Sequence, residues 1–185
     1  MFRPEVTVAA ICEDKGRFLL VEERAQRRRL FNQPAGHVER SETLIDAVIR
    51  EAREESAWLF TPAALIGVYL WRSPNGRRPF LRFAFAGGVS DHHPQQALDH
   101  AIVTTHWLSV AELQRRRARL RSPLVLYCIA DYMRGVRHDL AAVAKLDRRA
   151  AVARLTGGGR RCAGIPVTAV GLTVQARRLR PAPMR

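Results

Sequence analysis

Three glutamates of one expected helix could together hold a metal ion. Glu51, Glu54 and Glu55 stand three and four residues apart, so in a helix they share one edge within about 100° of arc. Bare carboxylates this close repel one another, by roughly a few tenths of a kcal/mol per exposed pair. A bound hard divalent cation makes the interaction energy of the cluster favourable instead. Mg²⁺ prefers carboxylate oxygens as ligands and keeps open positions for substrate phosphates. A solvated, glutamate-rich surface is the alternative that the spacing alone leaves open.

The segment that carries these glutamates has the strongest helical pattern in the first half of the chain. The pattern predicts a helix from about Thr43 to Ala57, with Ser41 as its N-cap and Glu42 in its first turn. Beside the glutamate edge the helix would present a broad apolar face for burial, formed by Leu44, Ile45, Val48, Ile49 and Ala52.

Strands are expected on both sides of this helix. Short runs rich in β-branched and aromatic residues predict strands over 6–12, 17–22, 64–71, 80–89 and 104–108. The sequence from Ser73 to Gly76 is a strong turn signal between the third and fourth of them, which predicts a hairpin. A polar loop is expected from Glu23 to Arg29, and Leu30 to Gln33 then runs into a loop at Pro34 to Gly36.

Two helices are expected to close the domain. They would run from Ser109 to about Arg117 and from Ser122 to Arg134, and Ser122 directly before Pro123 is typical of a capped helix start. Because strands and helices alternate along the chain, we expect an α/β sandwich with a mixed sheet.

The glutamate helix and the loop before it resemble the Nudix box. In that pattern Gly, five residues and Glu are followed by seven residues, Arg-Glu, an apolar residue, any residue, Glu-Glu, any residue, Gly and an apolar residue. The match has no gap, and it departs at one position, where Ala57 stands in place of Gly. The matching residues are Gly36, Glu42, Arg50, Glu51, Ala52, Glu54, Glu55 and Trp58.

The resemblance to the Nudix family implies both a fold and a chemistry. It implies a Nudix-type α/β/α sandwich and hydrolysis of a diphosphate linkage that depends on Mg²⁺, with Mn²⁺ as a substitute ion. The implied metal ligands and catalytic groups are Glu51, Glu54 and Glu55, together with the carbonyl of Gly36 as a backbone ligand. Arg50 would orient these glutamates through ion pairs and Glu42 would have a structural role, whereas the box does not fix the base that activates water.

Further segments resemble the NudJ-type phosphatases, a branch of bacterial Nudix hydrolases. The likeness covers residues 1 to about 135 and is carried by 2–8, 32–37, 79–83 and 120–125. It implies release of orthophosphate from nucleoside tri- and diphosphates, and conversion of hydroxymethylpyrimidine diphosphate, a thiamine precursor, to its monophosphate. The alternatives are an ADP-ribose or dinucleotide pyrophosphatase, and a nucleotide- or RNA-binding protein without catalysis; the intact glutamate triad favours an enzyme.

Three residues outside the box are further candidates for the site. Arg82 interrupts an apolar strand and could meet a substrate phosphate, with a buried salt bridge as the alternative. Trp71 could stack on a base or pyrimidine ring, or pack in the core. Asp99 lies in a polar loop where many Nudix enzymes have an extra acidic ligand or base, and a solvated loop carboxylate is its alternative.

The positive charge of the chain is concentrated near its end. Of a net charge of +14, residues 136–185 carry +9, with scattered Gly and Pro and no clear periodicity. We therefore expect one domain over 1–135 and a loosely ordered, Arg-rich tail over 136–185 that catalysis does not need. A helix from Leu140 to Leu155 that docks on the domain is the alternative. Nucleic acid could bind the tail, but composition alone does not favour it.

Composition excludes several classes of protein. The chain is 47% hydrophobic and 26% charged, which excludes wholesale disorder, and it contains no apolar run of the ~18 residues that a membrane span needs. No cleavable leader is expected, and Cys12, Cys128 and Cys162 lack metal-ligand spacing. We expect a cytoplasmic monomer that acts on a small nucleotide or pyrimidine diphosphate and has no membrane partner.

Overall fold

The computed structural model describes residues 3–25, 27–73 and 79–143. All of them belong to the unit of residues 1–145. The strands are β1 (Glu5–Asp14), β2 (Arg17–Ala25), β3 (Arg28–Asn32), β4 (Ala35–His37), β5 (Leu59–Trp71), β6 (Phe80–Ser90) and β7 (Ile102–Ser109). The α-helices are α1 (Leu44–Ser56), α2 (Val110–Arg115) and α3 (Leu124–Met133), and Arg117–Arg119 and Leu140–Val143 form the short 3₁₀-helices η1 and η2.

The strands form a mixed sheet in the order β3-β2-β1-β6-β5, with β4 paired to β1 and β7 paired to β2. Among the strand pairings of the described residues, that of β1 with β6 is the parallel one, and its register sets Val8 opposite Phe83. On its other edge β1 pairs antiparallel with β4, which sets Val8 opposite Gly36. The central strand thus fixes where the loop before α1 begins.

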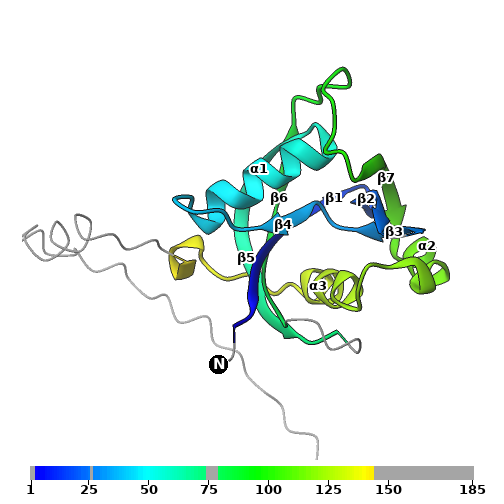
Figure 1. Ribbon diagram of the computed structural model, residues 1–185. Helices are drawn as coiled ribbons and strands as arrows, with labels where there is room; N and C mark the ends of the chain where they lie inside the picture. Colours follow the sequence, from blue (N-terminus) through cyan, green and yellow to red (C-terminus); the bar gives the residue numbers. More distant parts are fainter. Residues whose placement is uncertain (1–2, 26, 74–78, 144–185) are drawn as a thin grey trace, which may run out of the picture. The chain divides into compact units, whose positions relative to one another are not determined.

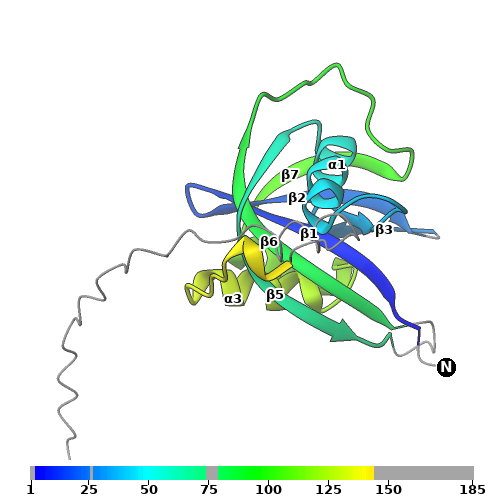
Figure 2. The same ribbon diagram turned by 90° about the vertical axis from the view of Figure 1, so that its left-hand side faces the viewer.

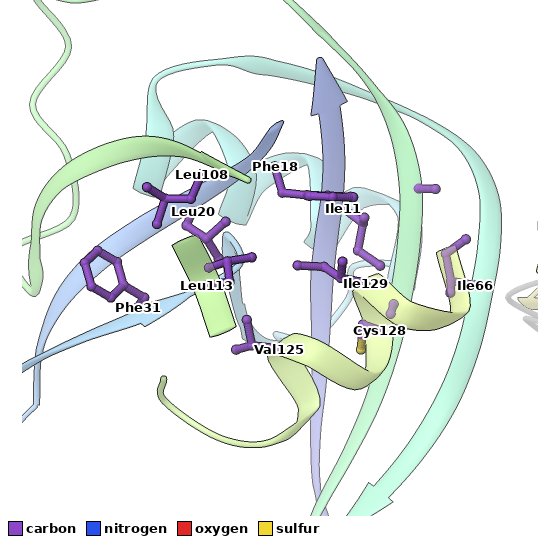
Figure 3. Packing of buried hydrophobic residues seen from close by; sticks show 12 residues of the cluster. Ile11, Phe18, Leu20, Phe31, Ile66, Leu108, Leu113, Val125, Cys128 and Ile129 are labelled. Carbon is purple, nitrogen blue, oxygen red and sulfur yellow. The ribbon is translucent and has the colours of Figure 1, made fainter. Parts of the chain in front are cut away.

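Helices cover both faces of the sheet, with α1 on one side and α3 on the other (Figures 1 and 2). Because side chains alternate along a strand, β1 contributes to both layers: Val8 and Ala10 pack with α1, and Ile11 packs with α3. Figure 3 shows the layer between α3 and the sheet, where Ile11, Phe18, Val125 and Ile129 meet in one cluster. The expected α/β/α sandwich with a mixed sheet is confirmed.

The segment expected to be loop contains two strands. β3 pairs with β2 over Arg28 to Asn32, and the three residues of β4 pair with β1. β2 itself continues to Ala25, beyond the expected end at residue 22. Both added strands are short, and β3 begins with two charged residues, so their local sequence carries little strand signal. The neighbouring strands β2 and β1 supply the hydrogen bonds that hold them in the sheet.

The expected helix around residue 50 is confirmed, but its cap differs. Thr43 is the N-cap of α1, and its hydroxyl and the carboxylate of Asp46 form a reciprocal capping box. Ser41 instead adopts a left-handed backbone conformation with φ of 77°. At the other end, Ala57 takes φ of 57° in the position where the Nudix pattern has Gly, the residue that adopts this conformation without strain.

The remaining elements also differ in detail from expectation. β5 begins at Leu59, five residues before the expected start. Ser122 does not cap α3, because its buried Oγ has no hydrogen-bond partner in the described part of the chain. The antiparallel pairing of β5 and β6 agrees with the expected hairpin, although residues 74–78 of the turn lie outside the described residues.

The described residues beyond 135 contact the sheet. Leu65 and His138 exchange two backbone hydrogen bonds (2.9 and 2.8 Å), and Leu140 and Val143 of η2 pack against the core layer of α1. Most of the expected helix from residue 140 to 155 lies outside the described residues. Among the helices that the structure describes, none is long and apolar enough to cross a membrane.

Candidate active site

Arg50 organises the charged edge of α1. Its guanidinium donates to the carboxylates of Glu42 (2.8 Å), Glu51 (2.8 Å) and Glu54 (3.1 Å), and to the carbonyl oxygen of His37 (3.0 Å). The hydrogen bond to Glu42 is the largest cause that raises the pKa of Arg50, so the side chain stays charged. One cation therefore forms ion pairs with three carboxylates and ties the helix to the strand before it.

Glu55 lies on the buried side of the same edge and is only 9% exposed. Its Oε2 accepts a hydrogen bond from the backbone N–H of Ala35 (2.8 Å). Burial raises the pKa of Glu55 to about 8, and the negative charges of Glu51 and Asp99 act in the same direction. An ionised carboxylate is costly to bury without a positive partner, so a bound cation would stabilise Glu55.

Gly36 leaves room for the carboxylate of Glu51. A Cβ at position 36 would lie 2.1 Å from Glu51 Oε1, a distance at which the two atoms overlap. Burial also raises the pKa of Glu51, and its hydrogen bond with Arg50 opposes that rise. The backbone at residues 35 and 36 thus lies directly beside the carboxylates of Glu51 and Glu55.

These groups fit a hard divalent cation in their chemistry. Carboxylate oxygens and a backbone carbonyl are the donors that Mg²⁺ binds, and no soft ligand is involved. Within the described ranges, no three Asp, Glu, His or Cys side chains are already gathered around one point. Arg50 engages Glu51 and Glu54 instead, and Ala35 engages Glu55. Binding a cation therefore requires the glutamates to exchange these contacts for the metal.

A pocket of about 180 Å³ opens beside Gly36. Arg82 lies in its wall and is 7% exposed. Its Nη1 donates to the side-chain amide oxygens of Asn32 (3.4 Å) and Gln33 (3.5 Å). These described partners are neutral amides, whereas the alternative of a buried salt bridge would need a carboxylate at this distance. Burial lowers the pKa of Arg82. The pocket is lined by Thr7, Glu23, Asn32, Ala35, Gly36, His37, Trp71, Phe80, Arg82, Arg121, Ser122 and Leu124.

Trp71 reaches this pocket from the end of β5. It pairs with Phe80 across the β5–β6 ladder, and the two rings stack with centroids 6.0 Å apart and planes inclined by 21°. Both rings line the pocket, so Trp71 lies at its aromatic wall and outside both core layers.

Sequence reasoning missed six polar residues of this pocket: Thr7, Glu23, Asn32, His37, Arg121 and Ser122. Glu23 was expected in a loop but lies on β2, where it forms an ion pair with Arg121 (2.7 Å). Burial raises the pKa of Glu23. Two features of the sequence could have pointed to these residues. One is the lone hydroxyl of Thr7 within an apolar strand, and the other is the segment 120–125 that resembles the family, although its local pattern does not reveal its chemistry.

Asp99 is anchored at the end of α1 and does not line the pocket. Its backbone N–H donates to the carbonyl oxygen of Glu54 (2.9 Å). Its side chain accepts from the N–H of Ala101 (2.8 Å) and lies 3.1 Å from Nδ1 of His100. The carboxylate is near enough to contribute to the raised pKa of Glu55, so the structure brings Asp99 to the same end of the helix as the buried glutamate.

Comparison with known sequences identifies similar proteins over most of the chain. The model of the NUDIX domain matches residues 1–127. Phosphatase NudJ of Escherichia coli strain K12 is 41% identical over 143 residues, which is 77% of this chain and 92% of that protein. Phosphatase NudJ of Shigella sonnei gives the same identity and coverage.

Solved structures give the same result. A NUDIX hydrolase from Nitrosomonas europaea superposes with a TM-score of 0.77 at 40% identity, over 79% of this chain and 99% of that one. A MutT NUDIX hydrolase from Burkholderia pseudomallei has a TM-score of 0.60 at 20% identity, over 70% of this chain and 98% of that one. At that identity the second likeness supports the fold alone.

Proposed function

The chain belongs to the Nudix family of hydrolases, and from that premise we propose that it releases orthophosphate from nucleoside tri- and diphosphates in a reaction that depends on Mg²⁺. The observation that carries the proposal is the meeting of the Glu55 and Glu51 carboxylates with the adjacent backbone positions Ala35 and Gly36, beside a pocket for the rest of the substrate. The substrate range is proposed from the likeness to Phosphatase NudJ, at 41% identity over 92% of that protein. By the same likeness we include hydroxymethylpyrimidine diphosphate, which would be converted to its monophosphate.

Nudix hydrolases use a divalent metal, and we propose Mg²⁺ here, with Mn²⁺ as a substitute. Glu51, Glu54, Glu55 and the carbonyl of Gly36 would hold it. When bound, the ion supplies neutralisation of phosphate oxygens and a lowered pKa for a water molecule. The buried, high-pKa carboxyl of Glu55 would be ionised by that positive charge and kept so through the reaction.

The other residues have supporting roles in this proposal. Arg50 positions Glu51 and Glu54, since its guanidinium already donates to both carboxylates. Arg82 and Trp71 bind the substrate in the pocket beside Gly36. Asp99 is the candidate for an extra acidic ligand or for the base that takes the proton of the attacking water, because it is anchored at the glutamate end of α1. We propose a cytoplasmic monomer, with the basic segment after residue 135 dispensable for the chemistry.

The phosphate product distinguishes the proposed reaction from one that releases pyrophosphate. Attack at the terminal phosphorus of CTP yields orthophosphate, whereas attack at the α-phosphorus yields pyrophosphate. Phosphorus NMR of the products of CTP, CDP, hydroxymethylpyrimidine diphosphate and ADP-ribose, with Mg²⁺ and then with excess EDTA, tests the assignment. We expect orthophosphate from the first three and none in EDTA. Pyrophosphate as the first product of CTP, or ADP-ribose as the preferred substrate, would contradict it.

A further inference from the structure

Arginines are concentrated in two segments of the folded domain. Residues 22–31 and 112–121 contain nine arginines and three glutamates, a net charge of +6, whereas residues 1–135 as a whole carry +5. The first segment covers the end of β2 and most of β3, at one edge of the sheet, and the second runs from α2 through η1 (Figure 1). The nine are Arg24, Arg27, Arg28, Arg29, Arg115, Arg116, Arg117, Arg119 and Arg121.

The two segments lie against each other, although they are far apart in the sequence. Nη2 of Arg28 donates to the carbonyl oxygen of Ala118 (3.2 Å). Nε of Arg119 donates to the carbonyl oxygen of Arg29 (3.4 Å). The fold therefore joins the nine arginines into one surface, hereafter the arginine surface.

The three glutamates leave most of this charge uncompensated. Glu22 pairs with Arg119 (2.9 Å) and lies 4.0 Å from Arg29. Glu23 pairs with Arg121 (2.7 Å), and the third glutamate pairs with an arginine outside the surface. Six arginines of the surface have no carboxylate of the described residues within 4.0 Å, and all but the fourth of them are exposed: Arg24, Arg27, Arg28, Arg116, Arg115 and Arg117.

Two of these cations face each other directly across β2 and β3. Arg24 lies opposite Arg29 in the antiparallel pair, which sets their Cβ atoms about 5 Å apart on the same face of the sheet. Like charges in this arrangement are destabilising unless an anion lies between them. Charged residues on an edge strand also hinder pairing with a second sheet, but that role does not need further arginines from α2 and η1. The surface therefore indicates a partner that carries several negative charges.

A groove of about 990 Å³ adjoins the arginine surface. Its lining includes Arg117 and Arg121 of that surface, together with Leu126 and Tyr127 of α3. Tyr127 is 64% exposed, so its ring is available for stacking. Cations beside an exposed aromatic ring are the combination that binds single-stranded nucleic acid, because the cations meet phosphates while a base stacks on the ring. A duplex keeps its bases stacked inside and offers the ring no such contact.

We propose that the arginine surface and the adjoining groove bind single-stranded nucleic acid, with arginines on the phosphates and Tyr127 stacked on a base. An arginine without a carboxylate partner can donate to a phosphate without first breaking an ion pair, and its planar fork suits phosphate oxygens. Arg24, Arg117 and Tyr127 do not line the pocket beside Gly36. Binding here is therefore an interaction separate from hydrolysis.

Fluorescence anisotropy of a uridine oligonucleotide with a 5′-hydroxyl end measures this binding. The full chain is titrated in EDTA over a series of salt concentrations, so that neither a terminal phosphate nor a metal directs the strand to the α1 glutamates. For the double variant Arg24→Gln/Arg117→Gln we expect about tenfold weaker binding at low salt. The slope of log K against log salt should become shallower by about 1.4, because each phosphate contact on a single strand contributes about 0.7. Arg40→Gln/Arg53→Gln removes the same charge from exposed positions outside the surface and should keep the wild-type slope.

Tyr127→Ala separates stacking from charge. We expect about tenfold weaker binding of the oligonucleotide, the effect of one lost stacked base, with the wild-type salt slope because no cation is removed. Met133→Ala, which removes another exposed large side chain of α3, is the control and should bind as the wild type does. The basic segment after residue 135 is present in every protein compared, so its contribution cancels.

Three results would overturn the proposal. Equal losses in the two arginine double variants, or no loss in either, would show that the arginine surface has no special part in binding. Full affinity in Tyr127→Ala, or tighter binding of a duplex of the same length, would exclude a single-stranded partner. Because the groove shares Trp71 and Ser122 with the pocket beside Gly36, displacement of the oligonucleotide by excess CMP would assign the binding to the substrate pocket instead.

Discussion

The carboxylate of Glu51 lies so close to Gly36 that any side chain at position 36 would have to displace it: a Cβ there would lie 2.1 Å from Glu51 Oε1. The first glycine of the Nudix box therefore leaves the space that the carboxylate of the first helix glutamate of the triad occupies. Its neighbour along the chain, Ala35, donates its backbone N–H to Glu55. Two adjacent backbone positions of β4 thus set the places of two carboxylates on α1.

This relationship predicts the effect of Gly36→Ala. The added methyl group should displace the Glu51 side chain, which can rotate, so the melting temperature should fall by only a few degrees. Displacement of about 1 Å at a reacting group costs on the order of a hundredfold in rate, and we expect a loss of kcat of that size. Gly88→Ala is the control, because a Cβ there meets nothing within 4 Å. Wild-type kcat in Gly36→Ala would contradict the packing account.

Arg50→Lys tests the orientation of the glutamates. A lysine ammonium cannot reproduce the arginine fork that reaches Glu42, Glu51 and the carbonyl oxygen of His37. We expect a lower kcat and a higher Mg²⁺ concentration for half-maximal rate, with little change in the KM for nucleotide. Arg53→Lys, an exposed change on the same helix, is the control. An unchanged Mg²⁺ dependence in Arg50→Lys would exclude the positioning role.

Glu55→Gln should stabilise the metal-free protein at alkaline pH. The pKa of Glu55 is raised to about 8 in the folded state, against an ordinary value of 4.5. The folded state therefore holds this proton more tightly, and the metal-free protein loses stability as the pH rises from about 4.5 through about 8. A glutamine is neutral throughout, so the variant should lack that loss and melt several degrees higher at pH 8, with no gain at pH 4.

Melting curves in EDTA across this pH range check the prediction. Glu54→Gln is the control, since the side chain of Glu54 is half exposed on the same helix edge. A Glu55→Gln protein that gains no stability between pH 4 and pH 8 relative to wild type would show that the buried carboxyl is already compensated without metal.

Two truncations locate the end of the folded unit. A chain ended after residue 145 keeps the backbone pair of Leu65 with His138 and the packing of Leu140 and Val143, whereas a chain ended after Gly135 loses them. We expect the longer chain to keep the wild-type melting temperature and a kcat within a few-fold of wild type. The shorter chain should melt lower, by about 4–8 °C for each kcal/mol lost. Equal melting of the two chains would show that residues 136–143 contribute no stability.

The helix and its chemistry could be predicted from the sequence because their signals are local. The spacing of Glu51, Glu54 and Glu55 and the apolar positions beside them follow from helical geometry alone. The cap was misassigned to Ser41, although Thr43 and Asp46 have the spacing of a capping box, because Ser41 followed by Glu42 offered a competing local pattern.

The pocket could not be predicted, because its parts become neighbours only through the sheet. Thr7 and Arg82 lie opposite each other in the parallel β1–β6 pair, a long-range pairing that no local pattern encodes. Glu23 was assigned to a loop because its charged surroundings mask the end of β2. β3 and β4 were missed for a related reason: short, polar or interrupted strands take their stability from their neighbours.

The most direct test of the account is orthophosphate release from CTP as a function of Mg²⁺ concentration, in the wild type and in Glu54→Gln. We expect no release in EDTA and saturation with Mg²⁺ in the wild type. In the variant we expect a kcat lower by orders of magnitude at saturating Mg²⁺, while both proteins show the same melting temperature within a few degrees. Release that persists in EDTA, or wild-type kcat in the variant at saturating Mg²⁺, would contradict a metal-dependent phosphohydrolase built on the α1 glutamates.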